Sequence, residues 1–421
     1  MKILLLGEYS NVHWTLAEGL RALGHKVTVL SNGDFWKNYP RDIDLVRKEG
    51  KIGGITYYLK ALSILPKLRG YDIVQLINPM FLELKAERMF FFYDYLRKHN
   101  RKIVLGAFGM DYYWCHVNAH QMPLRYSDFN IGSERRTDPV AMRDYNDWVG
   151  TAKGNLNQYI ARDCDAIVSG LYEYDVTYRA AGFGSKTTFI PFPIQSPTPT
   201  LPPVGGGVKY DSQDEGLTVN TNVNLPPTGG EVGYDSQDEP SSVETIDNIS
   251  PTGGGVGGGL RESAGGLDIF IGISRSRSVY KGTDKMLRAA QRIAEKYPDR
   301  VKLTVAEGVP FAEYQKMLDA ADVILDQLYA YTPGMNALEA MSRGTILVGG
   351  GEEEQYGIIN ETQLRPIINV QPTEESVYEE LERLVLHGDI QQLKRESIEY
   401  VRRHHDYIKV AKQYEKLYQS L

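Results

Sequence analysis

The chain opens with an apolar run, a helical pattern and a second apolar run. Ile3–Leu6 is continuously apolar, which is typical of a parallel strand buried on both faces. His13–Leu23 carries leucines at helical spacing, and Lys26–Leu30 is again mostly apolar. These segments predict a strand–helix–strand unit, the building block of a parallel sheet.

The same alternation recurs along most of the chain. Residues 108–150 are the exception: they are rich in aromatic and polar groups without clear periodicity, and predict a long irregular loop near a site. The alternation predicts an α/β fold with two parallel-sheet domains. The further predicted strands are Ile73–Ile77, Ile103–Ala107, Ala166–Ser169, Thr187–Pro191, Asp268–Ile273, Val301–Val305, Val323–Leu325, Thr345–Val348 and Pro366–Val370, with helices at Leu84–His99, Thr283–Lys296 and Phe311–Ala320 and three more at the C-terminal end.

One segment differs sharply from this pattern. Residues 196–266 hold 15 of the 41 glycines and 8 of the 20 prolines, and they carry ten acidic against two basic side chains. The segment also repeats, because Val208–Glu215 recurs as Val232–Glu239, 24 residues later. Its low apolar content predicts a disordered, acidic tandem-repeat insert. The Asp-x-x-Asp-Glu sequence within the repeat lacks the spacing of a full calcium loop.

Composition narrows the range of functions. Outside the insert the chain has 45 basic and 44 acidic residues, a balance that argues against a nucleic-acid binder. The two cysteines, Cys115 and Cys164, provide neither a disulfide framework nor a Cys-rich metal site. No run of 18 apolar residues occurs, so the sequence predicts no membrane span and a cytoplasmic protein by default.

Two segments of the second domain suggest an anion site. Pro333-Gly334 predicts a turn followed by a helix, which places free N–H groups and the positive end of a helix dipole at that turn. Arg275 follows a predicted strand, and Lys281 precedes the next helix. A forked cation and a point charge in these places suit a diphosphate, although a pair of surface cations remains open.

The segments together resemble the retaining glycosyltransferases of family 4, which have the GT-B fold. The resemblance spans nearly the whole chain outside the insert. It rests on Gly24–Val29, Thr188–Pro191, Arg275 with Lys281, Pro333–Gly344 and Val410–Tyr418. It implies a Rossmann-like acceptor domain (1–195), the insert (196–266), a Rossmann-like nucleotide-sugar donor domain (267–404) and a C-terminal helix (405–421) that crosses back to the first domain.

The resemblance also implies roles for individual residues. Arg275 and Lys281 match the pair that holds the donor diphosphate, and Glu339 matches the ribose-binding Glu of a paired-Glu signature. The first Glu of that signature, which contacts the donor sugar in the family, is replaced here by Tyr331. The implied sites are catalytic (Asp111, Arg275, Lys281), donor-binding (Gly7, Arg275, Lys281, Tyr331, Gly334, Met335, Asn336, Glu339) and on the acceptor side (Ser10, His13, Asn78).

The implied function is transfer of a sugar from a nucleoside-diphosphate sugar to a hydroxyl acceptor with retention, in polysaccharide or glycolipid synthesis. No metal and no cofactor is implied, since the nucleotide sugar is itself a substrate. The partners are the donor and a saccharide or lipid-linked acceptor, with peripheral contact at the inner face of the membrane. Three alternatives stay open: a sugar-nucleotide epimerase on the same fold, a catalytically weak nucleotide-sugar-binding protein, and a partner-binding role for the insert. For Asp111 a turn-stabilising role is an equal alternative, and for His13 a polar residue at a helix start.

Overall fold

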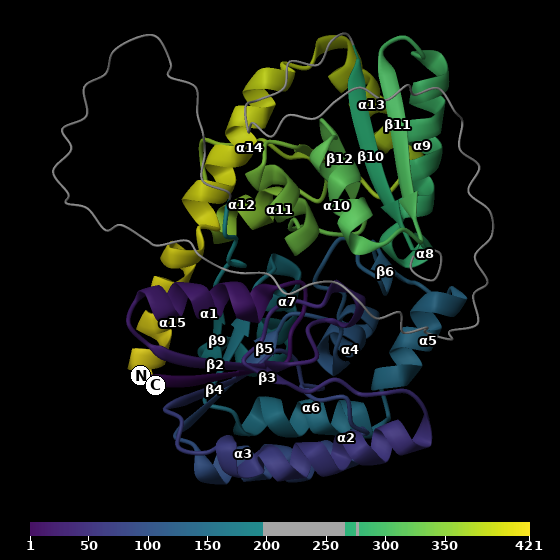
Figure 1. Cartoon of the computed structure of the whole chain (residues 1–421). Helices are drawn as coiled ribbons and strands as arrows, with labels where there is room; N and C mark the ends of the chain where they lie inside the picture. The colour runs from purple at the N-terminus through teal and green to yellow at the C-terminus, as the bar shows by residue number, and fades with distance from the viewer. Residues whose placement is uncertain (197–265, 275–277) are drawn as a thin grey trace, which may run out of the picture. The chain divides into compact units, whose positions relative to one another are not determined.

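The computed structural model describes residues 1–196, 266–274 and 278–421. The predicted repeat insert therefore lies almost wholly outside the described residues, as does Arg275. Within the described residues, the first half of the chain forms a seven-stranded parallel sheet in the order β3-β2-β1-β4-β5-β8-β9 (Figure 1). Its strands are β1 (Lys2–Leu6), β2 (Lys26–Ser31), β3 (Ile43–Asp44), β4 (Ile73–Leu76), β5 (Lys102–Ala107), β8 (Ala166–Ser169) and β9 (Thr187–Phe189).

Helices cover both faces of this sheet. Successive residues of β1 point to opposite faces, so Leu4 and Leu6 share a core with α2 and α3, whereas Ile3 and Leu5 share one with α1 (Figure 1). This two-sided burial explains why the strands read as continuous apolar runs. The helices of the first half are α1 (Val12–Ala22), α2 (Gly50–Ile64), α3 (Ala86–His99), α4 (Tyr112–His120), α5 (Pro139–Trp148), α6 (Ala152–Asp163) and α7 (Tyr172–Tyr178).

The described residues after the insert form a second, five-stranded parallel sheet in the order β11-β10-β12-β13-β14. The predicted α/β fold with two parallel sheets is thus confirmed. Its strands are β10 (Leu267–Ile273), β11 (Val301–Glu307), β12 (Val323–Asp326), β13 (Ile346–Gly349) and β14 (Ile368–Asn369), and its helices are α8 (Ser278–Lys281), α9 (Thr283–Lys296), α10 (Phe311–Asp319), α11 (Met335–Ser342), α12 (Glu353–Ile358), α13 (Glu374–His387), α14 (Ile390–His404) and α15 (Tyr407–Ser420).

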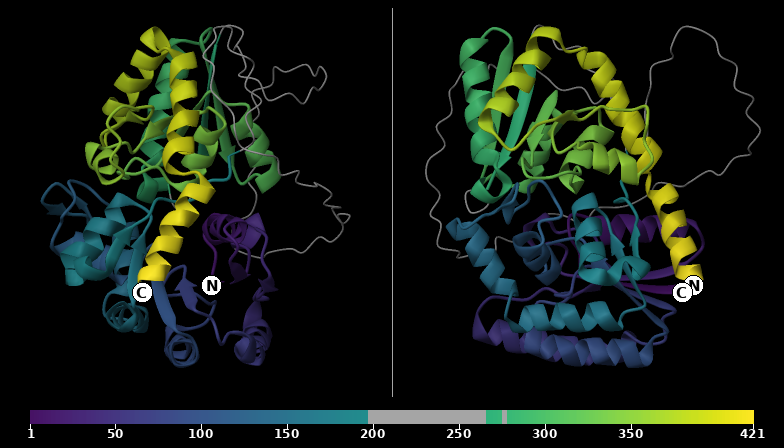
Figure 2. Two further views of the ribbon diagram at one scale, coloured as in Figure 1. Left: turned by 90° about the vertical axis from the view of Figure 1, so that its left-hand side faces the viewer. Right: turned by 180° about the vertical axis from the view of Figure 1, so that it is seen from behind.

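The last helix, α15, packs against α1 of the first domain (Figure 2). The contact is close because α1 has no side chain at Gly19, where a Cβ would lie 2.5 Å from the Tyr407 carbonyl oxygen. Polar contacts fix the far end of α15, where the Tyr418 hydroxyl donates to Gln75 at 2.7 Å and Glu415 contacts His25 at 2.9 Å. The chain thereby ends on the domain in which it began.

The prediction of one irregular loop over 108–150 is wrong. The stretch contains α4, α5 and a short antiparallel hairpin of β6 (Asn130–Ile131) and β7 (Glu134–Arg135). α4 shows no helical periodicity because neighbouring side chains in its first turns, among them Tyr113, Trp114 and Cys115, are all buried. Periodicity marks a helix only where one face meets solvent.

Candidate functional site

The loops that follow the parallel strands carry most of the predicted site residues. Gly7 follows β1, Asn78 follows β4 and Asp111 follows β5, while Tyr331 and Gly334 follow β12. In open parallel sheets, ligands bind in the crevice outside the carboxyl ends of the strands. The described part of the chain therefore brings the predicted residues to the edges where that fold binds ligands.

The first loop is held by buried polar contacts. Gly7 has a φ of +84°, and a Cβ there would lie 2.2 Å from Ile77 Cγ2, so only glycine fits. Glu8 accepts from the backbone N–H groups of His13 and Trp14 and thereby caps the start of α1. Burial raises the pKa of Glu8 to about 8, although these hydrogen bonds act in the opposite direction.

His13 and Ser10 are both engaged inside this loop. His13 is fully buried, with Nδ1 2.8 Å from the Gly7 carbonyl oxygen and Nε2 3.2 Å from Gln75. Burial lowers the pKa of His13 to about 3, so its ring is neutral at pH 7. The Ser10 hydroxyl accepts from Lys37 at 3.1 Å. The geometry shows both residues shaping the loop, and their acceptor role stays a prediction.

Asp111 and Asn78 also make local hydrogen bonds. The Asp111 carboxylate accepts from Trp114 N at 2.8 Å, which caps α4, and from the Tyr178 hydroxyl at 2.6 Å. Burial raises the pKa of Asp111 to about 6. Asn78 donates to the Met110 carbonyl oxygen at 3.2 Å and accepts from Met80 N at 3.0 Å. The turn-stabilising role that the sequence left open for Asp111 is therefore present.

In the second domain the predicted donor-binding residues surround the start of α11. Gly334 is its N-cap, Met335 is half-buried at its first position, and the Asn336 amide donates to the Tyr314 hydroxyl at 2.9 Å. Glu339, one turn further on, keeps 38% of its side chain exposed and accepts from Arg343 at 2.7 Å. Glu339 is the one carboxylate of α11.

Lys281 lies beside a buried acid. Burial raises the pKa of Asp326, while the charge of Lys281 and a hydrogen bond from the Gln327 side chain act in the opposite direction. Gln327 itself has a φ of +52°, a left-handed conformation that costs a non-glycine residue about 1–3 kcal/mol. Strain of this kind is found at ligand sites, where the surrounding fold enforces it.

Tyr331, for which the resemblance implies a contact with the donor sugar, is buried, and that role stays a prediction. Its side chain is 1% exposed, and its ring packs between Tyr126 and Tyr172, with centroid distances of 4.8 and 5.7 Å. Its hydroxyl accepts from the backbone N–H of Arg125 at 2.7 Å. The ring and the hydroxyl are both used inside the protein, at the contact between the two domains.

A buried carboxylate completes this contact. Glu352 accepts from the Tyr126 hydroxyl at 2.5 Å, from Arg125 at 2.6 Å and from Gln371 at 3.0 Å. Burial opposes ionisation of Glu352, but these hydrogen bonds, led by the one from Tyr126, lower its pKa below the ordinary value. Arg125 also pairs with the more exposed Glu354.

Glu173 is the residue that the sequence analysis missed. It stands in the first turn of α7, is 4% exposed, and its Oε1 accepts from the N–H groups of Tyr331 at 2.6 Å and Thr332 at 3.0 Å. In return, the Thr332 hydroxyl accepts from Tyr172 N at 3.1 Å. Burial raises the pKa of Glu173, although the hydrogen bonds that the carboxylate accepts act in the opposite direction. Its only signal in the sequence is its position just after a buried strand.

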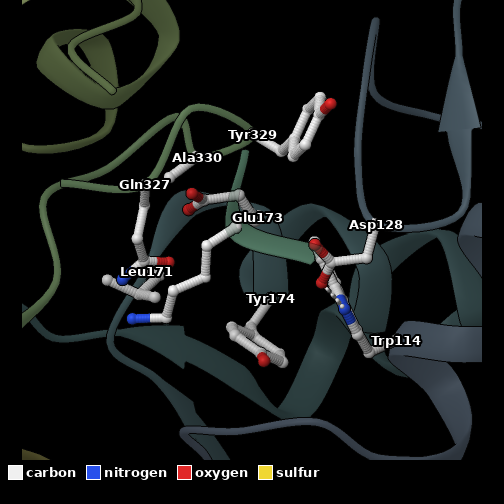
Figure 3. A pocket seen from close by; sticks show the side chains of 9 residues that line it. Trp114, Asp128, Leu171, Glu173, Tyr174, Gln327, Tyr329 and Ala330 are labelled. Carbon is white, nitrogen blue, oxygen red and sulfur yellow. Dashed lines mark hydrogen bonds between the residues drawn. The ribbon is translucent and has the colours of Figure 1, made fainter. Parts of the chain in front are cut away.

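A cavity of about 70 Å³ lies where these elements meet (Figure 3). In Figure 3 the Glu173 carboxylate lies on the side of Gln327 and Ala330, with Trp114 and Tyr174 across the cavity. The lining combines aromatic rings, two carboxylates, an amide and one ammonium group. It consists of Trp114, Asp128, Leu171, Glu173, Tyr174, Lys281, Gln327, Tyr329 and Ala330.

Two features are absent from the described residues. These residues contain no cluster of three or more His, Cys, Asp or Glu side chains arranged to hold a metal ion. Within the same residues, no helix combines the length and the hydrophobicity that crossing a membrane requires.

Comparison with known proteins identifies the fold. No protein-family model and no curated protein matches the sequence. Among solved structures, Alr3699/HepE from Anabaena in complex with UDP and glucose aligns over 100% of both chains, with a TM-score of 0.53 and 12% identity. Sucrose-phosphate synthase from Thermosynechococcus elongatus aligns over 100% of this chain and 99% of its own, with a TM-score of 0.54 and 14% identity.

WaaG, a glycosyltransferase involved in lipopolysaccharide biosynthesis, aligns over 99% of both chains with a TM-score of 0.50 and 11% identity. At this level of identity the alignments establish the architecture alone. The predicted GT-B fold, with two Rossmann-like domains, is confirmed.

The interdomain contact gives the first testable prediction. Glu352→Gln should lower the free energy of unfolding at pH 7 by about 1–3 kcal/mol, because buried donors lose a charged acceptor. Glu354→Gln, at the more exposed partner of Arg125, should cost less than about 1 kcal/mol. Urea denaturation followed by fluorescence measures both.

The same pair of variants has a pH signature. Because the folded state lowers the pKa of Glu352, its stabilisation is complete above the unfolded value near 4.5 and is lost as the pH falls below it. The stability difference between wild type and Glu352→Gln should therefore shrink between pH 5 and about pH 3. A difference that grows toward acid pH contradicts the assignment.

Proposed function

We propose that the protein is a family 4 glycosyltransferase that moves a sugar from a nucleoside-diphosphate sugar to a hydroxyl acceptor with retention. The observation that carries the proposal is the grouping of Lys281, the strained Gln327 and the start of α11 at one sheet edge of a GT-B fold. Two of the structural neighbours add support, since one is a sucrose-phosphate synthase and HepE was crystallised with UDP-glucose.

In this proposal the second domain binds the donor. Lys281 and Arg275 neutralise the diphosphate together with the N–H groups at the start of α11, and Glu339 accepts from the ribose hydroxyls. Cations in these places also stabilise the charge that develops on the leaving diphosphate, so transfer needs neither a metal ion nor a cofactor. Gly7 lets the first loop approach the donor closely.

The first domain binds the acceptor, a saccharide or lipid-linked hydroxyl compound of polysaccharide or glycolipid synthesis. Ser10, His13 and Asn78 shape that side of the crevice. Asp111 is the candidate catalytic carboxylate, because burial raises its pKa to about 6, which suits proton transfer near neutral pH. The epimerase and the weak binding protein are the alternative outcomes of the assays below.

The protein should also contact a membrane surface from the cytoplasmic side, and α2 is the element suited to it. Its outer face exposes Ile52 (78%), Ile55 (59%) and Leu59 (57%) at helical spacing, although its inner face is apolar as well. Residues 47–69 carry six basic side chains and one acidic side chain. An apolar stripe flanked by cations fits an anionic lipid surface.

Donor binding is tested with UDP, UDP-glucose, UDP-N-acetylglucosamine and GDP-mannose in a thermal-shift titration. At least one should stabilise the protein, and Lys281→Ala should weaken its binding tenfold or more, because one charge-assisted contact to the diphosphate is lost. Lys296→Ala is the matched control, since Lys296 ends α9 whereas Lys281 precedes its start. Equal effects of the two variants contradict the donor site.

Transfer is tested by mass spectrometry with the stabilising donor and a panel of saccharide and lipid-linked acceptors. We expect a glycosylated product whose anomeric configuration, read by NMR, matches the donor, and a rate that EDTA leaves unchanged. Donor isomerised without an acceptor identifies an epimerase, and binding without turnover identifies a binding protein. An inverted product contradicts the assignment to a retaining family.

Membrane contact is tested by flotation with vesicles of phosphatidylcholine alone or with about one third phosphatidylglycerol. Wild type should float only with the anionic vesicles, and the triple variant Ile52→Ser, Ile55→Ser, Leu59→Ser should stay at the bottom of the gradient. Leu386→Ser, at a 40% exposed residue of α13, is the control. Unchanged flotation of the triple variant assigns the contact to another surface.

A further inference from the structure

We propose that the cavity between α7 and the loop after β12 is the subsite for the transferred sugar, and that Glu173 accepts a hydrogen bond from one of its hydroxyl groups. The inference rests on the proposed function and deepens it, since it names a carboxylate on the first domain that selects the glycosyl group. Four features of the described residues support it.

The position of Glu173 is fixed from both domains. α7 supplies the side chain, and the N–H groups of Tyr331 and Thr332 hold its Oε1 at 2.6 and 3.0 Å. These donors come from the loop that leads into α11, next to the proposed diphosphate site. The carboxylate is thus oriented before any ligand arrives, which lowers the entropic cost of using it in recognition.

The other carboxylate oxygen, Oε2, is buried and has no hydrogen-bond partner among the described residues. A carboxylate oxygen accepts up to two hydrogen bonds, and a buried acceptor left without one is not compensated for the loss of its hydration. Protonation does not remove the problem, because a carboxylic acid would then have a donor without an acceptor. Glu173 lines the cavity, so a ligand hydroxyl that enters it can donate to the ionised carboxylate.

The chemistry of the cavity fits a sugar. At about 70 Å³ it corresponds to roughly two water molecules at their liquid volume of about 30 Å³ each, so it takes one hydroxyl-bearing edge of a sugar ring rather than a nucleotide. The carboxylates of Asp128 and Glu173 disfavour an anionic ligand in the cavity. Gln327 adds an amide with both hydrogen-bond donor and acceptor groups. Trp114 and Tyr174 supply flat apolar surfaces for the C–H faces of a ring.

Tyr331 does not compete for this role. Its hydroxyl already accepts from Arg125 N, its ring is packed between two tyrosines, and it does not line the cavity. What Tyr331 provides is its backbone N–H, which positions Glu173. The carboxylate that contacts the sugar is therefore Glu173 of the first domain. It is held by the main-chain N–H of Tyr331, the residue for which the sequence predicted the sugar contact.

The test separates recognition of the sugar from recognition of the nucleotide. Calorimetry measures the Kd of the stabilising nucleotide sugar and of its free nucleoside diphosphate, for example UDP-glucose and UDP. In Glu173→Gln the Kd of UDP-glucose should rise about tenfold, since the charged acceptor is lost, while that of UDP stays within twofold. Glu354→Gln, another interdomain carboxylate, and Tyr331→Phe should change neither Kd by more than about twofold.

A fluorinated donor provides a test that does not depend on the variant folding. Replacing the recognised hydroxyl group of the sugar by fluorine removes the O–H that donates the hydrogen bond. At one ring position this change should weaken binding to the wild type about tenfold. In Glu173→Gln that penalty should largely disappear, because the two changes remove the same hydrogen bond.

The outcomes separate the two proposals. Equal weakening of UDP and UDP-glucose by Glu173→Gln, or no fluorine penalty at any ring position, overturns the role of Glu173 and leaves the donor site intact. If no nucleoside diphosphate binds the wild type, the proposed function fails, and this inference fails with it.

Discussion

Two buried carboxylates, Glu173 and Glu352, join the two domains of this protein, and Glu173 does so through the main chain. Glu173, on the first domain, accepts two main-chain N–H groups from the loop of the second domain that leads into α11. Main-chain donors are fixed by the fold, so this contact sets the conformation of the loop as well as its distance from α7. The packing of Tyr331, the position of Gly334 and the shape of the cavity all depend on that loop.

The tyrosine at position 331 fits this arrangement. A tyrosine there fills the space between Tyr126 and Tyr172, and its hydroxyl meets the backbone N–H of Arg125. A glutamate in the same buried place would bring a third carboxylate beside Glu173 and Glu352, and like charges in a poorly solvated site are costly. An aromatic ring therefore suits position 331, because Glu173 of the first domain already supplies a charge there.

The sequence predicts the sheets well and the connecting helices less well. β8 and α9 begin and end at the predicted residues, because a strand buried on two faces and a helix exposed on one face have distinctive patterns. The helices α2 and α6 were not predicted. α2 is apolar on both faces and contains Gly53 and Gly54, so its pattern and its helix propensity are both weak.

For the site, the sequence locates the loops but not the contacts made across domains. Tyr331 lies in the loop between β12 and α11, and Lys281 lies at the end of α8. The partner of the Tyr331 N–H, however, lies 158 residues away, and no local pattern indicates it. That partner, Glu173, also lines the cavity. Its second carboxylate oxygen has no partner among the described residues, so a sugar bound in the cavity would add to the contact that this carboxylate makes between the domains. Recognition of the donor and exclusion of water would then depend on one side chain.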